Sequence, residues 1–139
     1  MPDHLSISVA EIAETERFYS AALAPLGYKR VGGHSNSIGF GKDDPNFWLS
    51  FTQHPVMRAK ESRLRFYLAA ENLWAVHAFY DAALTAGGEA DGEPGLRNGV
   101  GENYYAATII DPDGHRVEAY CNRFRLNEFG FKTPARGTL

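Results

Sequence analysis

The sequence predicts one α+β domain built from two βαβββ modules in succession, with the helices on the outside of the sheets. Residues 18–23 (FYSAAL) recur 61 positions later as residues 79–84 (FYDAAL), and both copies have the composition and apolar spacing of a helix. The segments before the two copies alternate apolar and polar side chains, as strands with one covered face do. Because 139 residues suit one core, we expect a single domain, with modules over about 1–56 and 61–123 and a tail over 124–139.

Each module is expected to begin with a strand followed by a helix. Residues 4–9 alternate strictly, with leucine, isoleucine and valine on one face and histidine and serine on the other. Residues 65–70 repeat this alternation at the same offset as the helical segments. The helices are expected over 12–23 and 72–86, because glycine follows each of them and commonly ends a helix.

Three further short strands complete each module. They are expected near residues 28–31, 37–40 and 47–52 in the first module, and near 89–91, 104–110 and 115–121 in the second. Residues 111–114 (DPDG) predict a tight turn between the last two strands, with proline and glycine at favoured positions. The glycine-rich segment 87–101 is expected to form a flexible lip over a pocket. Arg97 in this lip is expected to be exposed, unless the lip brings it to a ligand.

Composition and charge exclude several classes of partner. The formal charge is −3 and the basic residues are dispersed, so no nucleic-acid surface is expected. No apolar run approaches the roughly 20 residues of a membrane span. The first residues show no basic stretch followed by an apolar run, so no secretory signal is expected. Cys121 is the only cysteine, which excludes an internal disulfide. We therefore expect a cytoplasmic protein.

Three segments resemble the vicinal-oxygen-chelate superfamily, which includes glyoxalase I, bleomycin-resistance proteins and extradiol dioxygenases. Residues 104–118 (YYAATIIDPDGHRVE) resemble its closing hairpin, residues 18–27 resemble its first helix and exit, and residues 94–97 (PGLR) resemble a glyoxalase-like subgroup. The resemblance covers roughly residues 4–122. It implies that the two modules form an open, mostly antiparallel, barrel-like sheet around a pocket, with the helices outside.

The same resemblance implies where a metal would bind. Metal-dependent members hold a divalent ion with side chains from the first and last strands of each module. His4 matches one first-strand position and Glu118 one last-strand position. Arg65, at the repeat offset from His4, takes the other first-strand position, and a guanidinium has only donors and cannot ligate a metal. On the remaining strand, Trp48 and Ser50 offer no carboxylate.

A metal-free pocket follows from this pattern. Unit charges about 4 Å apart interact by about 4 kcal/mol at an effective dielectric constant of about 20, and a divalent ion beside Arg65 would double that repulsion. Arg65 is expected to pair with Glu118 in place of the ion, and to offer a bidentate donor to a carboxylate or phosphate. No cofactor is expected. The residues expected to line the pocket are His4, Trp48, Ser50, Arg65, Tyr67, Tyr105 and Glu118, none with an assigned catalytic role.

Two functions remain open at this point. The first is a metal-independent pocket for a small, partly aromatic or anionic molecule, either in a binding protein or in a diverged enzyme. The alternative is a metal-dependent lyase or isomerase resembling lactoylglutathione lyase, holding zinc, nickel, iron or manganese. Arg65 and the missing carboxylate near Ser50 favour the first. Because modules of this superfamily pair edge to edge, within one chain or between two, a homodimer is expected.

Overall fold

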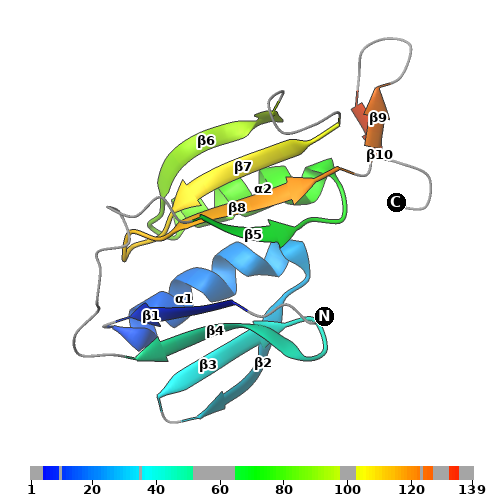
Figure 1. Cartoon of the computed structure of the whole chain (residues 1–139). Helices are drawn as coiled ribbons and strands as arrows, with labels where there is room; N and C mark the ends of the chain where they lie inside the picture. The colour runs from blue at the N-terminus through cyan, green and yellow to red at the C-terminus, as the bar shows by residue number, and fades with distance from the viewer. Residues whose placement is uncertain are drawn as a thin grey trace.

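The computed structural model of the chain describes residues 5–9, 11–34, 36–51, 65–97, 103–122, 124–126 and 132–134. His4 lies outside the described residues. The described part forms two four-stranded sheets, each with its own helix, and a separate two-stranded hairpin (Figure 1). Within these residues, neither helix is long and apolar enough to cross a membrane.

The first module forms a sheet in the strand order β1-β4-β3-β2. Its elements are β1 (Leu5–Val9), α1 (Ile12–Leu23), a short 3-10 helix η1 (Ala24–Leu26), β2 (Lys29–His34), β3 (Ser37–Gly41) and β4 (Pro45–Phe51). β1 and β4 run parallel, whereas β3 pairs antiparallel with both β2 and β4. A parallel pair needs a long connection, and α1 lies in it.

The second module repeats this arrangement in the strand order β5-β8-β7-β6. Its elements are β5 (Arg65–Ala69), α2 (Leu73–Thr85), β6 (Glu89–Leu96), β7 (Tyr105–Ile110) and β8 (Arg116–Cys121). β5 and β8 are parallel and the other pairs antiparallel, so the repeated βαβββ order is confirmed. In the tail, β9 (Phe124–Leu126) and β10 (Lys132–Pro134) form an antiparallel hairpin that the sequence pattern does not predict.

Local sequence explains where α2 begins and ends. The side-chain oxygen of Asn72 accepts a hydrogen bond from the backbone N–H of Ala75 at 2.9 Å, which caps the first turn. Gly87 follows the helix with a φ of +113°, in the left-handed region that glycine adopts without a clash at Cβ. These two residues therefore set the boundaries close to those expected.

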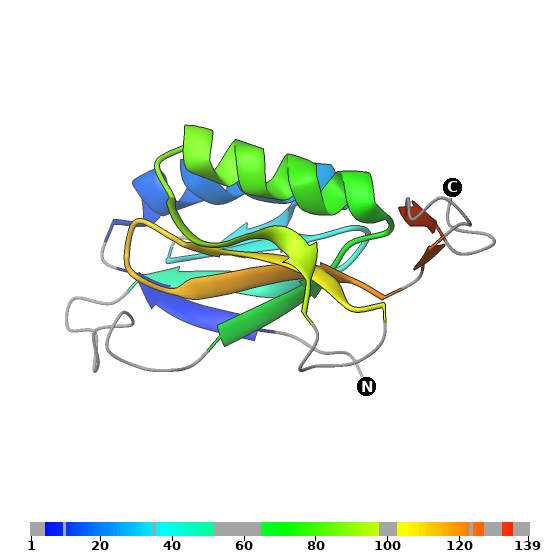
Figure 2. The same cartoon turned by 90° about the horizontal axis from the view of Figure 1, so that it is seen from above.

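The core lies between the sheets and the helices. Both helices cover the same side of the sheets and pack against each other (Figures 1 and 2). Phe18 of α1 and Phe79 of α2, which begin the two repeated segments, are buried in this core. Val9 is buried there too, so the predicted apolar face of β1 is covered at this residue, and Phe47 and Leu49 of β4 are buried in the same core.

The predicted extent of one strand is wrong. The strand expected near residues 89–91 runs to Leu96 as β6. Gly92 and Gly95 do not end it, because β6 pairs with β7 through register shifts at these glycines, as strands with bulges do. Most of the expected flexible lip is therefore a paired edge strand, and residues 98–102 lie outside the described residues.

Candidate functional site

Each sheet has one face turned away from α1 and α2, which we call the open face. In the second module, Leu68 and Val117 point toward the helices and are buried, so the alternate residues belong to the open face. The register pairs Tyr67 with Glu118 across β5 and β8, and Thr108 with Glu118 across β7 and β8. Directly paired residues share a face, so these three residues form a row on the open face.

Glu118 is the centre of this row. Its side chain is only 4% exposed. Oε1 accepts hydrogen bonds from Arg65 Nη1 at 3.1 Å and from Thr108 Oγ1 at 3.2 Å. Oε2 accepts a hydrogen bond from the Tyr104 hydroxyl at 2.7 Å. A buried carboxylate needs such partners, because an unpaired charge is costly away from water. The predicted ion pair between Arg65 and Glu118 is present, and both carboxylate oxygens are engaged.

A second carboxylate extends the charged cluster toward β6. Arg65 Nη2 lies 3.9 Å from Asp91 Oδ2, and Arg116 Nε lies 3.4 Å from the same oxygen. The register pairs Arg65 with Arg116, which places the two guanidinium groups side by side. Asp91 thus offsets repulsion between neighbouring cations. The three side chains are 24–38% exposed, so solvent screens the pairs with Asp91 more than the pair with Glu118.

Tyr104 is a site residue that was not predicted from the sequence. Its ring stacks on that of Tyr120, with 5.4 Å between the centroids and 6° between the planes. Burial, followed by the hydrogen bond to Glu118, raises the pKa of Tyr104 above its usual value of 10. The hydroxyl therefore stays protonated at neutral pH and donates to the carboxylate. The alternation of a strand could have indicated this role, because Tyr104 and Thr108 lie an even number of positions apart and so point to the same face of the sheet.

The structure does not bring Tyr105 to the open face. Tyr105 is buried on the helix side of β7, and its hydroxyl lies 2.6 Å from Nε2 of His77 on α2. The register that pairs Thr108 with Glu118 turns the odd-numbered residues of β7 toward the helices. Tyr104 occupies the open-face place that was expected for Tyr105.

The open face of the first module carries Trp48 and Ser50, which alternate with core residues of β4. The Trp48 indole lies across the neighbouring strands above two glycines. A Cβ on Gly39 would come within 3.0 Å of two ring carbons, and a Cβ on Gly32 would come within 3.5 Å of one. The glycine at position 39 therefore leaves the space that lets the ring lie over β3.

The expected pocket residues are thus distributed over two open faces. Arg65, Tyr67 and Glu118 lie together in the second module, whereas Trp48 and Ser50 lie in the first. Tyr67 is 53% exposed, which leaves most of its ring accessible. His4 lies outside the described residues.

Among the described residues, those at the positions that the resemblance implies do not fit a divalent ion. Catalytic zinc sites commonly use about three protein ligands with free lone pairs. Glu118 is committed to three donors, Arg65 has no acceptor atom, and Trp48 and Ser50 supply no carboxylate. The described residues at these positions therefore supply one carboxylate whose two oxygens are already engaged.

The turn between β7 and β8 holds another group of potential ligands. Ligand atoms of Asp111, Asp113 and His115 lie within 4.8 Å of one another. The Asp111 carboxylate accepts hydrogen bonds from the Tyr19 hydroxyl and from the backbone N–H groups of Asp113 and His115. Burial, followed by the charge of Asp111, raises the pKa of Tyr19, so its hydroxyl remains a donor. These bonds fasten the turn to α1 and give the group a structural role.

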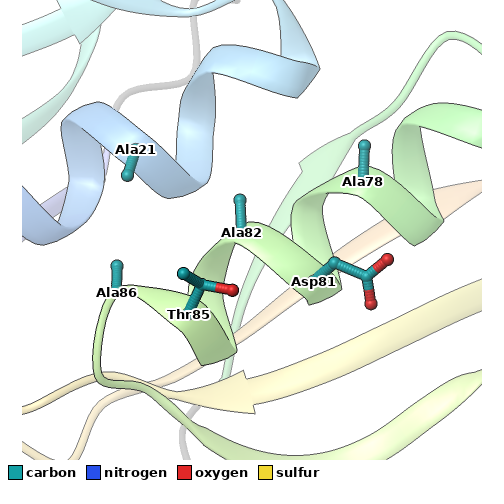
Figure 3. A pocket seen from close by; sticks show the side chains of 6 residues that line it. All are labelled: Ala21, Ala78, Asp81, Ala82, Thr85 and Ala86. Atoms are coloured by element: carbon teal, nitrogen blue, oxygen red, sulfur yellow. The ribbon is translucent and has the colours of Figure 1, made fainter.

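A groove of about 600 Å³ lies on the other side of the molecule, between α1 and α2 (Figure 3). It is lined by Ala21, Ala78, Asp81, Ala82, Thr85 and Ala86. Its walls are mostly methyl groups, and Asp81 is its one ionisable side chain among these. The open faces instead carry the hydrogen-bonded Glu118 network and the rings of Tyr67 and Trp48, which makes them the better candidate site.

Solved structures share the fold of this chain. A glyoxalase/bleomycin resistance protein from Albidiferax ferrireducens T118 is 25% identical with a TM-score of 0.71, and the match covers 86% of this chain and 96% of that one. A fosfomycin resistance protein from Mesorhizobium loti is 13% identical with a TM-score of 0.62, covering 86% and 89%. A glyoxalase I mutant from Zea mays is 21% identical with a TM-score of 0.60, covering 86% of this chain but 46% of that one.

The family is shown by the sequence match as well as by the fold. The two less similar structures establish likeness of fold alone, because their identities are low. A search among curated proteins gives no match. Residues 2–119, most of the chain, match the model of one family. The chain therefore belongs to the Glyoxalase/Bleomycin resistance protein/Dioxygenase superfamily.

Proposed function

We propose that the open faces of this chain bind a small organic molecule with an aromatic or anionic part, and that they do so without a metal. The observation that carries the proposal is the buried Glu118 carboxylate. Its two oxygens accept hydrogen bonds from Arg65, Thr108 and Tyr104. The superfamily resemblance puts a metal ligand at this strand position, so the network takes the place that an ion would need.

Electrostatics supports the proposal. Arg65 Nη1 lies 3.1 Å from Glu118 Oε1, and its side chain is 38% exposed. Unit charges about 4 Å apart interact by about 4 kcal/mol at an effective dielectric constant of about 20, so a divalent ion next to Arg65 would meet about twice that repulsion. The ion would also have to displace hydrogen-bond donors from Glu118. Both effects oppose metal binding while the guanidinium is present.

The character of the ligand follows from the side chains on the two faces. Trp48 supplies a flat indole on the first module, and Tyr67 supplies a largely exposed ring on the second. Aromatic walls with a few placed polar groups are typical of small-molecule sites. The proposed lining set is His4, Trp48, Ser50, Arg65, Tyr67 and Glu118, with Tyr104 in place of Tyr105.

Metal affinity in matched variants tests the metal-free proposal. We expect wild-type protein to show no submicromolar binding of zinc, nickel or cobalt by titration calorimetry. Arg65→His should bind at least about tenfold more tightly, because it removes a cation and adds an imidazole beside Glu118. Arg30→His is the control. Arg30 also forms an ion pair with a carboxylate, Glu16 at 2.6 Å, but away from the open face.

Two outcomes would change the account. Submicromolar binding by wild type that is lost in Glu118→Gln would contradict the proposal, and would favour the metal-dependent lyase or isomerase. Negligible binding by both wild type and Arg65→His would leave the metal-free function standing. It would show, however, that Arg65 is not the group that excludes the ion.

A further inference from the structure

Arg97 lies on the open face of the second module, although it follows the edge strand β6. Its backbone N–H donates to the carbonyl of Tyr104 at 2.8 Å, opposite the start of β7. Its side chain folds back along β6, where Nη2 donates to the carbonyl of Glu93 at 2.9 Å and Nη1 to that of Gly95 at 3.4 Å. The guanidinium is therefore held in one place by the backbone of its own strand.

Gly92 of β6 provides the space for this guanidinium, and Gly95 lies beside it. A Cβ on Gly92 would lie 3.0 Å from Arg97 Nη2, and one on Gly95 would lie 3.5 Å from Nη1. The same Cβ on Gly92 would lie 3.6 Å from Cβ and Oγ1 of Thr108. Because Thr108 donates to Glu118 on the open face, the guanidinium lies on that face as well. A side chain at position 92 would have to push the guanidinium away.

Arg97 differs from the other guanidinium groups of this face in its partners. Arg65 pairs with Glu118, and Arg116 pairs with Asp91. The hydrogen bonds of Arg97 within the described part of the chain go to two backbone carbonyls, and no described carboxylate pairs with it. A guanidinium carries five N–H donors in a planar fork that matches carboxylate and phosphate oxygens. Arg97 is therefore a cation in a fixed position, and its charge and remaining N–H donors are available to a ligand.

We propose that Arg97, laid over Gly92 and Gly95, binds the anionic group of the ligand, a carboxylate or a phosphate, through a bidentate contact. This inference rests on the proposed function and assigns the anion to Arg97 instead of Arg65, whose charge is used by Glu118. It also accounts for the glycine at position 92, where a Cβ would approach the guanidinium to 3.0 Å.

Protein-observed NMR titration of the full chain tests this assignment. The probes are benzoate, phenyl phosphate and benzamide, which share a ring but differ in charge. In wild type we expect both anions to shift the amide resonances of Gly92, Gly95 and Arg97, and to bind about tenfold more tightly than benzamide. Whichever anion binds more tightly identifies the group as a carboxylate or a phosphate.

Two variants and one control make the result specific. Arg97→Gln should lower the affinity for both anions about tenfold, to that of benzamide, and should leave benzamide binding unchanged. Gly92→Ala keeps every charge but fills the place of the guanidinium, so it should also weaken anion binding. If Arg97→Gln does not fold, Gly92→Ala provides the test of whether Arg97 binds the anion. Arg30→Gln, which removes a cation from the other face, should behave as wild type.

The failures of the two proposals can be told apart. If Arg97→Gln keeps the preference for anions, or if wild type binds anion and amide equally on the open face, the role of Arg97 is overturned while the ligand site stands. If no probe shifts any open-face resonance, both the role of Arg97 and the proposed small-molecule site fail.

Discussion

At the scale of single residues, the chemistry of this chain depends on how the buried charge of the Glu118 carboxylate is neutralised. A buried carboxylate on a sheet can be neutralised by a metal, by a proton or by hydrogen-bond donors. Here the donors are Arg65 on β5, Thr108 on β7, and Tyr104 immediately before β7. Tyr104 is the partner whose role can be isolated most cleanly, because its hydroxyl titrates.

Replacing Tyr104 should change how stability depends on pH. The folded-state pKa of Tyr104 is raised above 10, so folded protein holds this proton more tightly than unfolded protein. The resulting stabilisation is fully present below pH 10 and is lost as the pH rises toward the folded-state pKa. Wild type should therefore lose stability more steeply above pH 10 than Tyr104→Phe. Urea denaturation over a pH series measures both slopes.

The appropriate control for that experiment is Tyr120→Phe, which removes a hydroxyl from the same stacked pair. The raised pKa of Tyr19 contributes in the same direction in all three proteins, so it cancels in the comparison. At neutral pH, Tyr104→Phe should also cost about 1.5–3 kcal/mol, the usual range for a hydrogen bond to a charged group. Equal slopes in wild type and Tyr104→Phe would contradict the assigned role.

At the scale of elements, the sequence predicts the order of strands and helices well and the facing of side chains less well. The 61-residue repeat can be recognised in the sequence itself. The strict alternation of residues 4–9 can be recognised there too, because burial of one strand face imposes a period of two residues. The face of Tyr105 depends on the register of the β7–β8 hairpin, and the length of β6 depends on bulges at its glycines. Both are set by pairing between strands, which a single sequence does not display.

The packing of Trp48 on β3 gives a test at this scale. A Cβ at Gly39 would approach Pro45 Cβ to 2.8 Å and the indole to 3.0 Å, whereas one at Gly32 would make ordinary contacts at 3.5 Å. Gly39→Ala should therefore destabilise the fold by about 1–3 kcal/mol and displace the ring, while Gly32→Ala should do much less. In a Trp74→Phe background, fluorescence reports on Trp48 alone, and thermal unfolding measures the change in stability. Equal effects of the two alanines would refute the proposed packing.

At the scale of the whole molecule, the two modules pack through their helices and leave two open faces (Figures 1 and 2). The polar cluster of the second module and the indole of the first lie on different sheets. Residues of the candidate site could be named from the sequence, but their division between two faces could not, because it depends on how the modules pack. A second copy of the chain is the partner that symmetry most readily supplies to such faces.

We therefore predict a homodimer in solution. Light scattering coupled to size exclusion should give twice the chain mass of 15.4 kDa at micromolar concentration. The proportion of dimer should fall on dilution, since association depends on concentration. A mass of one chain throughout the micromolar range would contradict the prediction, and would require each open face to bind its ligand without a partner.

The metal-free proposal requires that Glu118 is neutralised by protein donors and not by a metal ion. The most direct measurement is the metal content of native protein that has been purified without a metal-affinity step. Elemental analysis should find zinc, nickel, iron and manganese each well below one ion per chain. One ion per chain that survives extensive dialysis, and that is absent from Glu118→Gln prepared in the same way, would contradict the account.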